Sequence, residues 1–121
     1  MSEDPGAVPV EIGNVLHPVA DVEAAVRFYA GAFGLATKFV DGGRYAALDA
    51  GPTTLALAGP GEDVTGGVPA ASFKVPEVAA ALAAVVARGG SVVRPPETGP
   101  HEVRAVARDP WGNTLVLYGP R

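Results

Sequence analysis

The chain has 121 residues, of which 48% are hydrophobic and 18% are charged, so it is long and apolar enough to form the core of one globular domain. It has no cysteine, which excludes disulfides and thiolate chemistry, and its net charge of −4 without a basic cluster argues against a nucleic-acid partner. No apolar run reaches the length of a membrane span and the first residues are acidic, so we expect a cytoplasmic protein that does not contact membranes.

The first half of the chain predicts one strand, one helix and three further strands. Residues 1–8 are interpreted as a loose leader. Asp21 is a good helix N-cap, apolar residues recur after it at helical spacing, and Gly34 suits a left-handed helix end. The expected order is a strand at 10–16, a helix at 22–33 and strands at 37–40, 45–48 and 53–58.

The second half predicts the same order after a polar, Gly-rich linker at about 60–68. Glu77 lies near the start of the expected helix, and Gly89-Gly90 follows its end. Pro95-Pro96 favours a loop that reaches about residue 99. The expected elements are a strand at 71–75, a helix at 78–87 and strands at 91–94, 103–107 and 114–118.

The two halves also share sequence. VADVEAAV at 19–26 reappears as VPEVAAAL at 75–82, and TLALAGP at 54–60 reappears as TLVLYGP at 114–120. Two segments that recur in the same order indicate two copies of one supersecondary unit. We therefore predict an α+β fold of two tandem βαβββ modules in a single domain at 9–119, with module 1 at about 9–59 and module 2 at about 69–119.

This doubled module resembles the vicinal oxygen chelate superfamily, the group of glyoxalase I, fosfomycin-resistance enzymes, extradiol dioxygenases and bleomycin-resistance proteins. The motifs that carry the resemblance are VADVEAAVRFY at 19–29, FGL at 33–35 and DPWGN at 109–113, and it covers about residues 10–119. The resemblance implies that the modules form curved mixed sheets around a cavity. It specifies the fold and not the reaction, because this fold carries several chemistries as well as binding without catalysis.

In the metalloenzymes of that superfamily, His and Glu side chains on cavity-facing strands hold a divalent metal. At the four implied ligand positions this sequence has Asn14, Ala56, Ala70 and Val116. Three of these side chains have no donor atom, whereas divalent metals need several oxygen, nitrogen or sulfur donors. We therefore expect no metal and no cofactor, and neither glyoxalase nor dioxygenase chemistry.

Two histidines are the candidate acid–base residues. Strand alternation places Asn14 and Leu16 on the cavity face and His17 on the opposite face, where a structural role would apply, unless a bend at Pro18 turns it inward. His101 lies in a loop, where it would be exposed or would reach the cavity mouth.

The remaining candidates would contact a ligand. Arg104 would pair with a ligand carboxylate or phenolate, or else face solvent or pair with Glu102 or Asp49. Trp111 would cap the core or form a wall of the site, and Phe39 and Tyr45 would line the cavity entrance. The expected ligand-binding set is Asn14, Leu16, Phe39, Tyr45, Ala56, Ala70, Ser72, Arg104, Trp111 and Val116.

Such a cavity, with mainly small and apolar side chains, suits a largely hydrophobic or aromatic small molecule. The leading hypothesis is metal-independent binding of such a molecule, of the bleomycin-resistance type that sequesters a drug. The alternatives are a metal-free isomerase, epimerase or lyase that uses His17 or His101, and a regulatory domain whose cavity is closed. An open curved sheet has exposed edges, so we also expect a homodimer.

Overall fold

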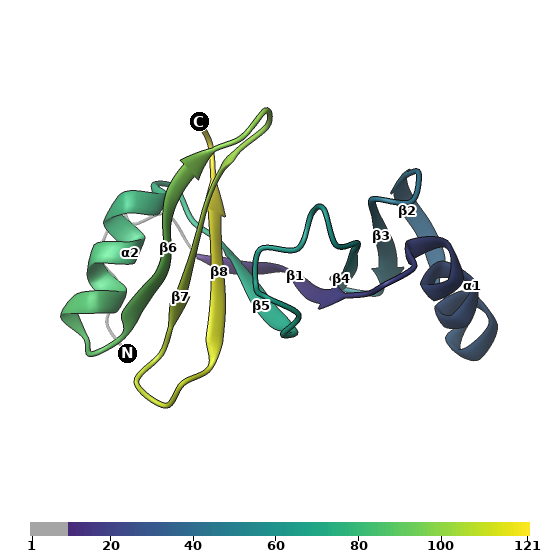
Figure 1. Ribbon diagram of the computed structural model, residues 1–121, viewed down its shortest axis with the longest axis horizontal. Coiled ribbons are helices and arrows are strands. Elements are labelled where there is room, and N and C mark those ends of the chain that lie inside the picture. Colours follow the sequence, from purple (N-terminus) through teal and green to yellow (C-terminus); the bar gives the residue numbers. More distant parts are fainter. Residues whose placement is uncertain (1–9) are drawn as a thin grey trace.

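Two βαβββ units follow one another along residues 10–121, the part of the chain that the computed structural model describes (Figure 1). The leader expected at 1–8 lies outside the described residues. The order confirms the expected α+β fold. The elements are β1 (Glu11–Pro18), α1 (Val22–Phe33), β2 (Ala36–Asp41), β3 (Tyr45–Ala50), β4 (Thr53–Ala58), β5 (Ala70–Lys74), α2 (Val78–Ala87), β6 (Ser91–Thr98), β7 (Val103–Arg108) and β8 (Thr114–Gly119).

All of these strands belong to one eight-stranded sheet in the order β2-β3-β4-β1-β5-β8-β7-β6. The two modules join where β1 pairs antiparallel with β5, so module 1 and module 2 extend to opposite ends of the sheet (Figure 1). Within each module the first strand pairs parallel with the last, as β1 does with β4 and β5 with β8. The joint between modules is therefore a pair of equivalent strands.

Both helices cover the same face of the sheet. Asp21 caps α1 by accepting a hydrogen bond of 3.0 Å from the backbone N–H of Ala24, and Gly34 ends the helix at a φ of 72°. The carboxylate of Glu77 caps α2 in the same way. One core lies under α1 around Val22, Leu48 and Leu57, and a second lies under α2. The second core consists of Val75, Val78, Leu82, Ala105, Ala107 and Leu117.

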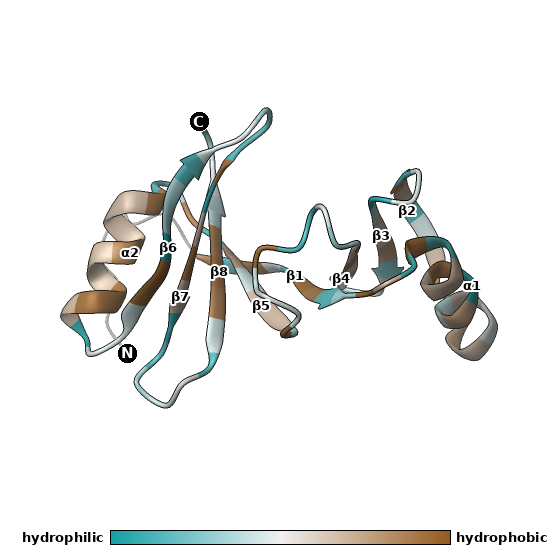
Figure 2. Cartoon of the chain, in the orientation of Figure 1, coloured by the Kyte–Doolittle hydropathy of each residue, from teal (hydrophilic) through white to brown (hydrophobic). Residues whose placement is uncertain are grey.

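The opposite face, called here the helix-free face, carries a third core of Leu16, Ala56, Ala58, Ala70 and Val116. Strand alternation places these residues opposite the helices, because their sequence neighbours such as Leu57 and Leu117 pack on the helix side. Hydrophobic colours follow α2 and the middle of β7 and β8 in Figure 2, and hydrophilic colours gather at the turns. Neither helix is long and apolar enough to cross a membrane.

Strand β6 extends to Thr98, so the loop expected from Pro95-Pro96 was wrong. Proline cannot donate a ladder hydrogen bond, and it is tolerated in a sheet at an edge or an irregularity. Both conditions hold here, because β6 is the last strand of the sheet and its register with β7 shifts between Arg94 and Glu97. Pro95 and Pro96 therefore have no partner in the β6–β7 register, and pairing resumes at Glu97 opposite Arg104.

Candidate ligand-binding site

The helix-free face has a buried apolar cluster at its centre. Its five residues, Leu16, Ala56, Ala58, Ala70 and Val116, are each at most 7% exposed. Val64, from the segment that joins the modules, and Tyr45, from β3, pack against them. The sequence analysis expected open space in front of Ala56 and Ala70. The structure differs because the joining segment folds back over these positions.

A polar pair lies beside this cluster, at the joint between the modules. Asn14 on β1 is directly opposite Ser72 on β5, and Ser72 is only 3% exposed. The Oδ1 atom of Asn14 is buried and has no hydrogen-bond partner among residues 10–121. Leaving a buried acceptor unpaired costs about 1–3 kcal/mol, so a donor group on a ligand would gain by binding there.

Next to this pair, the two modules bring together four polar side chains, Tyr45, Glu102, Arg104 and Tyr118. Arg104 is directly opposite Tyr118 in the β7–β8 pairing, and its Nε atom is 3.9 Å from Oε2 of Glu102. Tyr45 comes from β3 of the other module, and the charges of Glu102 and Arg104 act on its phenol. We call these four residues the polar group.

Burial controls protonation in the polar group. Burial raises the pKa of Tyr45 and the pKa of Tyr118, and the negative charge of Glu102 raises both further. Burial also raises the pKa of Glu102 above its ordinary value, although the positive charge of Arg104 opposes this. Both phenols therefore keep their protons and can donate hydrogen bonds to a ligand.

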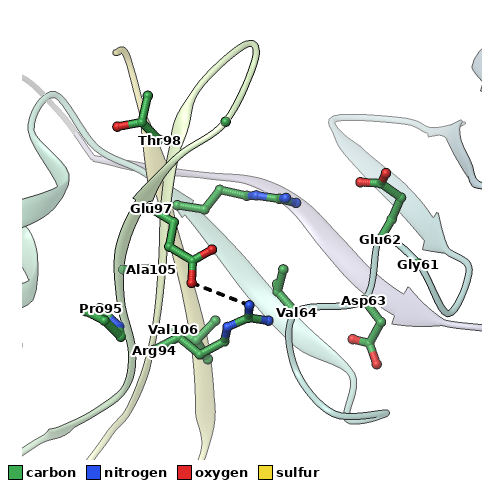
Figure 3. Close-up of a pocket in the computed structure, with 12 residues that line it drawn as sticks. Gly61, Glu62, Asp63, Val64, Arg94, Pro95, Glu97, Thr98, Ala105 and Val106 are labelled. Atoms are coloured by element: carbon green, nitrogen blue, oxygen red, sulfur yellow. Dashed lines mark ion pairs between the residues drawn. The ribbon is translucent and has the colours of Figure 1, made fainter.

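A cavity of about 200 Å³ lies between residues 61–64 and strands β6 and β7 (Figure 3). Across it, Glu62 and Val64 face a wall that includes Arg94 and Glu97, whose Nη2 and Oε1 atoms are 3.5 Å apart. The lining is richer in charge than the apolar cavity expected from the sequence. It consists of Gly61, Glu62, Asp63, Val64, Arg94, Pro95, Glu97, Thr98, Gly99, Arg104, Ala105 and Val106.

The family model described as Glyoxalase/Bleomycin resistance protein/Dioxygenase superfamily matches residues 11–117. The chain belongs to this superfamily. An uncharacterized protein of Mycolicibacterium smegmatis is 37% identical over 110 residues, which are 91% of this chain and 94% of that protein. The similarity therefore extends over nearly the whole of both chains.

Solved structures share the fold at low identity. One described as the NAD-dependent benzaldehyde dehydrogenase of Legionella pneumophila has a TM-score of 0.75 at 18% identity and covers 93% of this chain and 100% of its own. The methylmalonyl-CoA epimerase of Mycobacterium tuberculosis has a TM-score of 0.65 at 18% identity, with coverages of 90% and 87%. A superfamily member from Vibrio splendidus 12B01 has a TM-score of 0.67 at 14% identity, with coverages of 92% and 97%. At these identities the similarity shows the fold alone.

The residues present do not fit the metal centre of the superfamily's metalloenzymes. Ala56, Ala70 and Val116 lie together in the buried cluster, but none of them has a donor atom. Asn14 alone offers an oxygen, which is neutral. Within residues 10–121, no three His, Cys, Asp or Glu side chains gather closely enough to hold a metal ion.

The segment between the modules is more structured than the linker expected from its composition. The Oδ1 atom of Asp63 accepts hydrogen bonds from the N–H and hydroxyl of Thr65, both at 2.8 Å, and its Oδ2 atom accepts one from Gly67 at 2.7 Å. Burial would raise the pKa of Asp63, but these hydrogen bonds outweigh burial and hold the pKa below its usual value. The sequence signal for this turn was Asp63 placed two residues before Thr65.

The two candidate histidines differ in their relation to the polar group, because the charge of His101 acts on the neighbouring Glu102 and His17 lies elsewhere. The Nδ1 atom of His17 is 3.2 Å from the hydroxyl of Tyr29, which places His17 on the helix side, where alternation predicted it. His101 is exposed in the loop between β6 and β7. Glu102 and Tyr118 were not predicted as site residues, because the sequence indicated Glu102 only as a partner of Arg104 and Tyr118 only as part of a strand.

The two large aromatic candidates lie in different surroundings. Phe39 is 57% exposed, and its ring centroid is 6.4 Å from that of Tyr45. Trp111 is 84% exposed in the turn between β7 and β8, where the side chain of Asp109 accepts a hydrogen bond from the backbone N–H of Trp111. Phe39 therefore extends the aromatic surface of Tyr45, whereas Trp111 caps none of the three cores.

Proposed function

We propose that the protein binds a small, largely hydrophobic or aromatic molecule on the helix-free face and needs no metal to do so. The observation that carries the proposal is that Tyr45 of module 1 lies near enough to Glu102 and Arg104 of module 2 for their charges to act on its phenol, and that Arg104 lines a cavity of about 200 Å³. Binding sites usually combine apolar walls with a few polar groups that orient the ligand. The helix-free face offers both kinds of surface.

The distribution of side chains suggests how such a ligand would lie. The exposed ring of Phe39 and the ring of Tyr45 form an aromatic surface. Beside this surface, Arg104 and the protonated phenol of Tyr118 would bind a carboxylate, a phenolate or a carbonyl oxygen. The proposed activity is sequestration of the bleomycin-resistance type, in a cytoplasmic homodimer.

A metal-free isomerase, epimerase or lyase is the second candidate, and Glu102 is the observation that favours it. Its raised pKa and its position beside Arg104 are properties of carboxyl groups that transfer protons. His101 precedes Glu102 and its charge opposes the rise that burial causes in the pKa of that carboxyl, so His101 would remain a candidate partner in proton transfer, whereas His17 lies beside Tyr29 on the helix side. Recovery of the ligand unchanged after prolonged incubation would favour binding over catalysis.

The test is a thermal-shift screen of aromatic carboxylates and phenols in buffer with a metal chelator. A ligand at 100 times its dissociation constant stabilises the folded state by about 2.7 kcal/mol, which is a measurable shift. Arg104→Met should weaken binding of the hits. Arg108→Met, on the same strand and exposed, should leave it unchanged. The proposal fails when no compound stabilises the protein, or when Arg104→Met and Arg108→Met bind the hits with the same affinity.

The homodimer has a separate test. Every residue of β2 is exposed, and β2 is one edge of the sheet, so its backbone groups are open to pairing with a second copy. Light scattering at micromolar concentration should give twice the mass of one chain. A monomer under these conditions would contradict this part of the proposal.

A further inference from the structure

Val64 lies where a ligand at the centre of the helix-free face would have to bind. It packs against Leu16, Ala56, Ala58, Ala70 and Val116, and it is itself only partly buried. Three of these five residues, Ala56, Ala70 and Val116, are at the positions where the resemblance to the superfamily's metalloenzymes implies metal ligands. The segment that carries Val64 therefore covers the deepest part of this face.

We propose that residues 59–68 form a lid, and that Val64 fills an apolar subsite when no ligand is present. A small apolar group of the ligand, such as one aromatic ring or a branched alkyl chain, binds to the same five side chains in exchange for Val64. This inference rests on the proposed function, because it concerns the same face of the sheet.

The hydrogen bonds that shape the segment run largely within it. Asp63 accepts hydrogen bonds from Thr65 and Gly67, and the N–H groups of Glu62 and Asp63 donate to the carbonyl of Gly59. Thr65 also bonds to the carbonyl of Val68. The N–H of Gly59 donates a hydrogen bond of 2.8 Å to the carbonyl of Arg44, so Gly59 is the fixed end of the segment. The residues after Gly59 can therefore move together without breaking the strand pairing of the sheet.

Glycines near the C-terminal end of the segment provide a hinge. Gly66 and Gly67 have φ angles of 72° and 88°, a conformation that side-chain-bearing residues rarely adopt. An ion pair between Glu62 and Arg44 connects the other end of the segment to the residue before β3. The Arg44 side chain is 68% exposed and the Glu62 side chain 24%, so this half-exposed ion pair holds the segment closed by an amount that a single substitution can remove.

There is also space for the movement. The cavity of about 200 Å³ lies directly between residues 61–64 and strands β6 and β7, with Val64 among its lining residues. Figure 3 shows Val64 at this boundary, on the opposite side of the cavity from Glu97 and Pro95. Movement of the segment into this cavity would uncover the apolar cluster without displacing a strand.

Toluene is the probe that tests the lid, with alanine methyl NMR as the readout. In Val64→Ala, toluene should bind about tenfold more tightly than in the unmodified protein, because the competing side chain is gone. The methyl signals of Ala56 and Ala70 should shift on titration. Val68→Ala is the matched control, because Val68 belongs to the same segment but is 45% exposed, and it should bind as the unmodified protein does.

Equal toluene affinity in Val64→Ala and the unmodified protein, or binding without shifts at Ala56 and Ala70, would overturn the proposal. Glu62→Gln provides a second test that leaves the apolar cluster intact. It should speed hydrogen exchange in residues 61–65 and raise toluene affinity, whereas Glu97→Gln, which breaks the other ion pair of the cavity, should do neither. Unchanged exchange in Glu62→Gln would also overturn it.

Failure of the lid can be told apart from failure of the proposed function. The proposed function is tested by the binding of aromatic compounds from the screen and by the loss of that binding in Arg104→Met. The lid is tested by the toluene affinity of Val64→Ala. If the screen compounds bind in a way that depends on Arg104, but toluene affinity is the same with and without the Val64 side chain, the proposed function is supported and the lid is rejected.

Discussion

The hydroxyl of Tyr118 lies against the backbone of Gly13, so that a Cβ atom at position 13 would overlap the phenol. Gly13 lies at the irregularity of the β1–β5 pairing, between Ile12 and Asn14. The ring of Tyr118 can cross β1 at this point because residue 13 has no side chain. The position of one member of the polar group therefore depends on a glycine in the other module.

Gly13→Ala is expected to displace Tyr118 and to lower the free energy of unfolding by about 1–3 kcal/mol, the usual cost of overpacking. Urea unfolding measures this. Because the nearest atom to the new Cβ is the phenol oxygen, Gly13→Ala combined with Tyr118→Phe should cost less than the sum of the two single changes. Strict additivity would show that the hydroxyl is not the obstacle.

Asn14→Leu is expected to leave the free energy of unfolding unchanged or to raise it by about 1 kcal/mol, because it removes a buried acceptor that has no partner. Asn113→Leu is the comparison, since the Asn113 side chain donates a hydrogen bond of 2.8 Å to Asp109. That variant should lose about 0.5–1.5 kcal/mol. A larger loss in Asn14→Leu than in Asn113→Leu, measured by urea unfolding, would contradict the prediction.

The pH dependence of stability is expected to carry a contribution from Glu102. Burial raises its folded-state pKa above the ordinary value of 4.5, so the folded state holds the proton more tightly than the unfolded state does. The stability from this proton is complete below pH 4.5 and is lost as the pH rises through the raised pKa.

Glu102→Gln keeps the neutral form at every pH and should remove this loss. The unmodified protein should therefore become less stable relative to Glu102→Gln as the pH rises from 4.5, in thermal unfolding measured over a pH series. Glu97→Gln serves as the control, because the Glu97 side chain is 65% exposed. Parallel pH profiles for the unmodified protein and Glu102→Gln would show that burial does not act on this carboxyl.

Ala56→Leu is expected to lower the free energy of unfolding by about 1–3 kcal/mol, because Ala56 is buried beneath Val64 and Tyr45 in a packed cluster. Ala47→Leu is the matched control, since Ala47 is directly opposite Ala56 on β3 but only half-buried. It should cost less, as urea unfolding would measure. Equal stability of the two variants would show that the cluster is loosely packed.

The fold could be predicted from the sequence because its signals are local and occur twice. Asp21 and Gly34 mark the ends of α1 by cap and turn chemistry, and both act as expected. The repeated segments then predicted that the second half has the same order of elements along the chain as the first. The extension of β6 through Pro95-Pro96 could not be predicted, because it depends on β6 being an edge strand, which is a property of the assembled sheet.

The site was harder to predict because it depends on contacts between distant segments. Strand alternation correctly separated His17 from Leu16, since alternation is local. The packing of Val64 on Ala56 is not local, and the composition of the joining segment indicated only a flexible linker. The gathering of Tyr45 with Glu102 and Tyr118 likewise requires the two modules to be placed side by side before it can be seen.

The pairing of β1 with β5 makes the two sides of the helix-free face differ in polarity. Val15 pairs with Ala71, and the repeated sequence makes Asn14 the counterpart of Ala70 and Leu16 the counterpart of Ser72. The polar pair Asn14 and Ser72, on one side of Val15 and Ala71, therefore corresponds in the repeat to the apolar pair Leu16 and Ala70 on the other side.

The same correspondence matches Tyr45 with Arg104, because their strand partners, Ala58 and Tyr118, are equivalent in the two repeats. A duplicated framework would by itself accept a molecule in either of two orientations related by a half-turn. Here the two halves differ in polarity, so an elongated ligand of the proposed kind would bind in one orientation only.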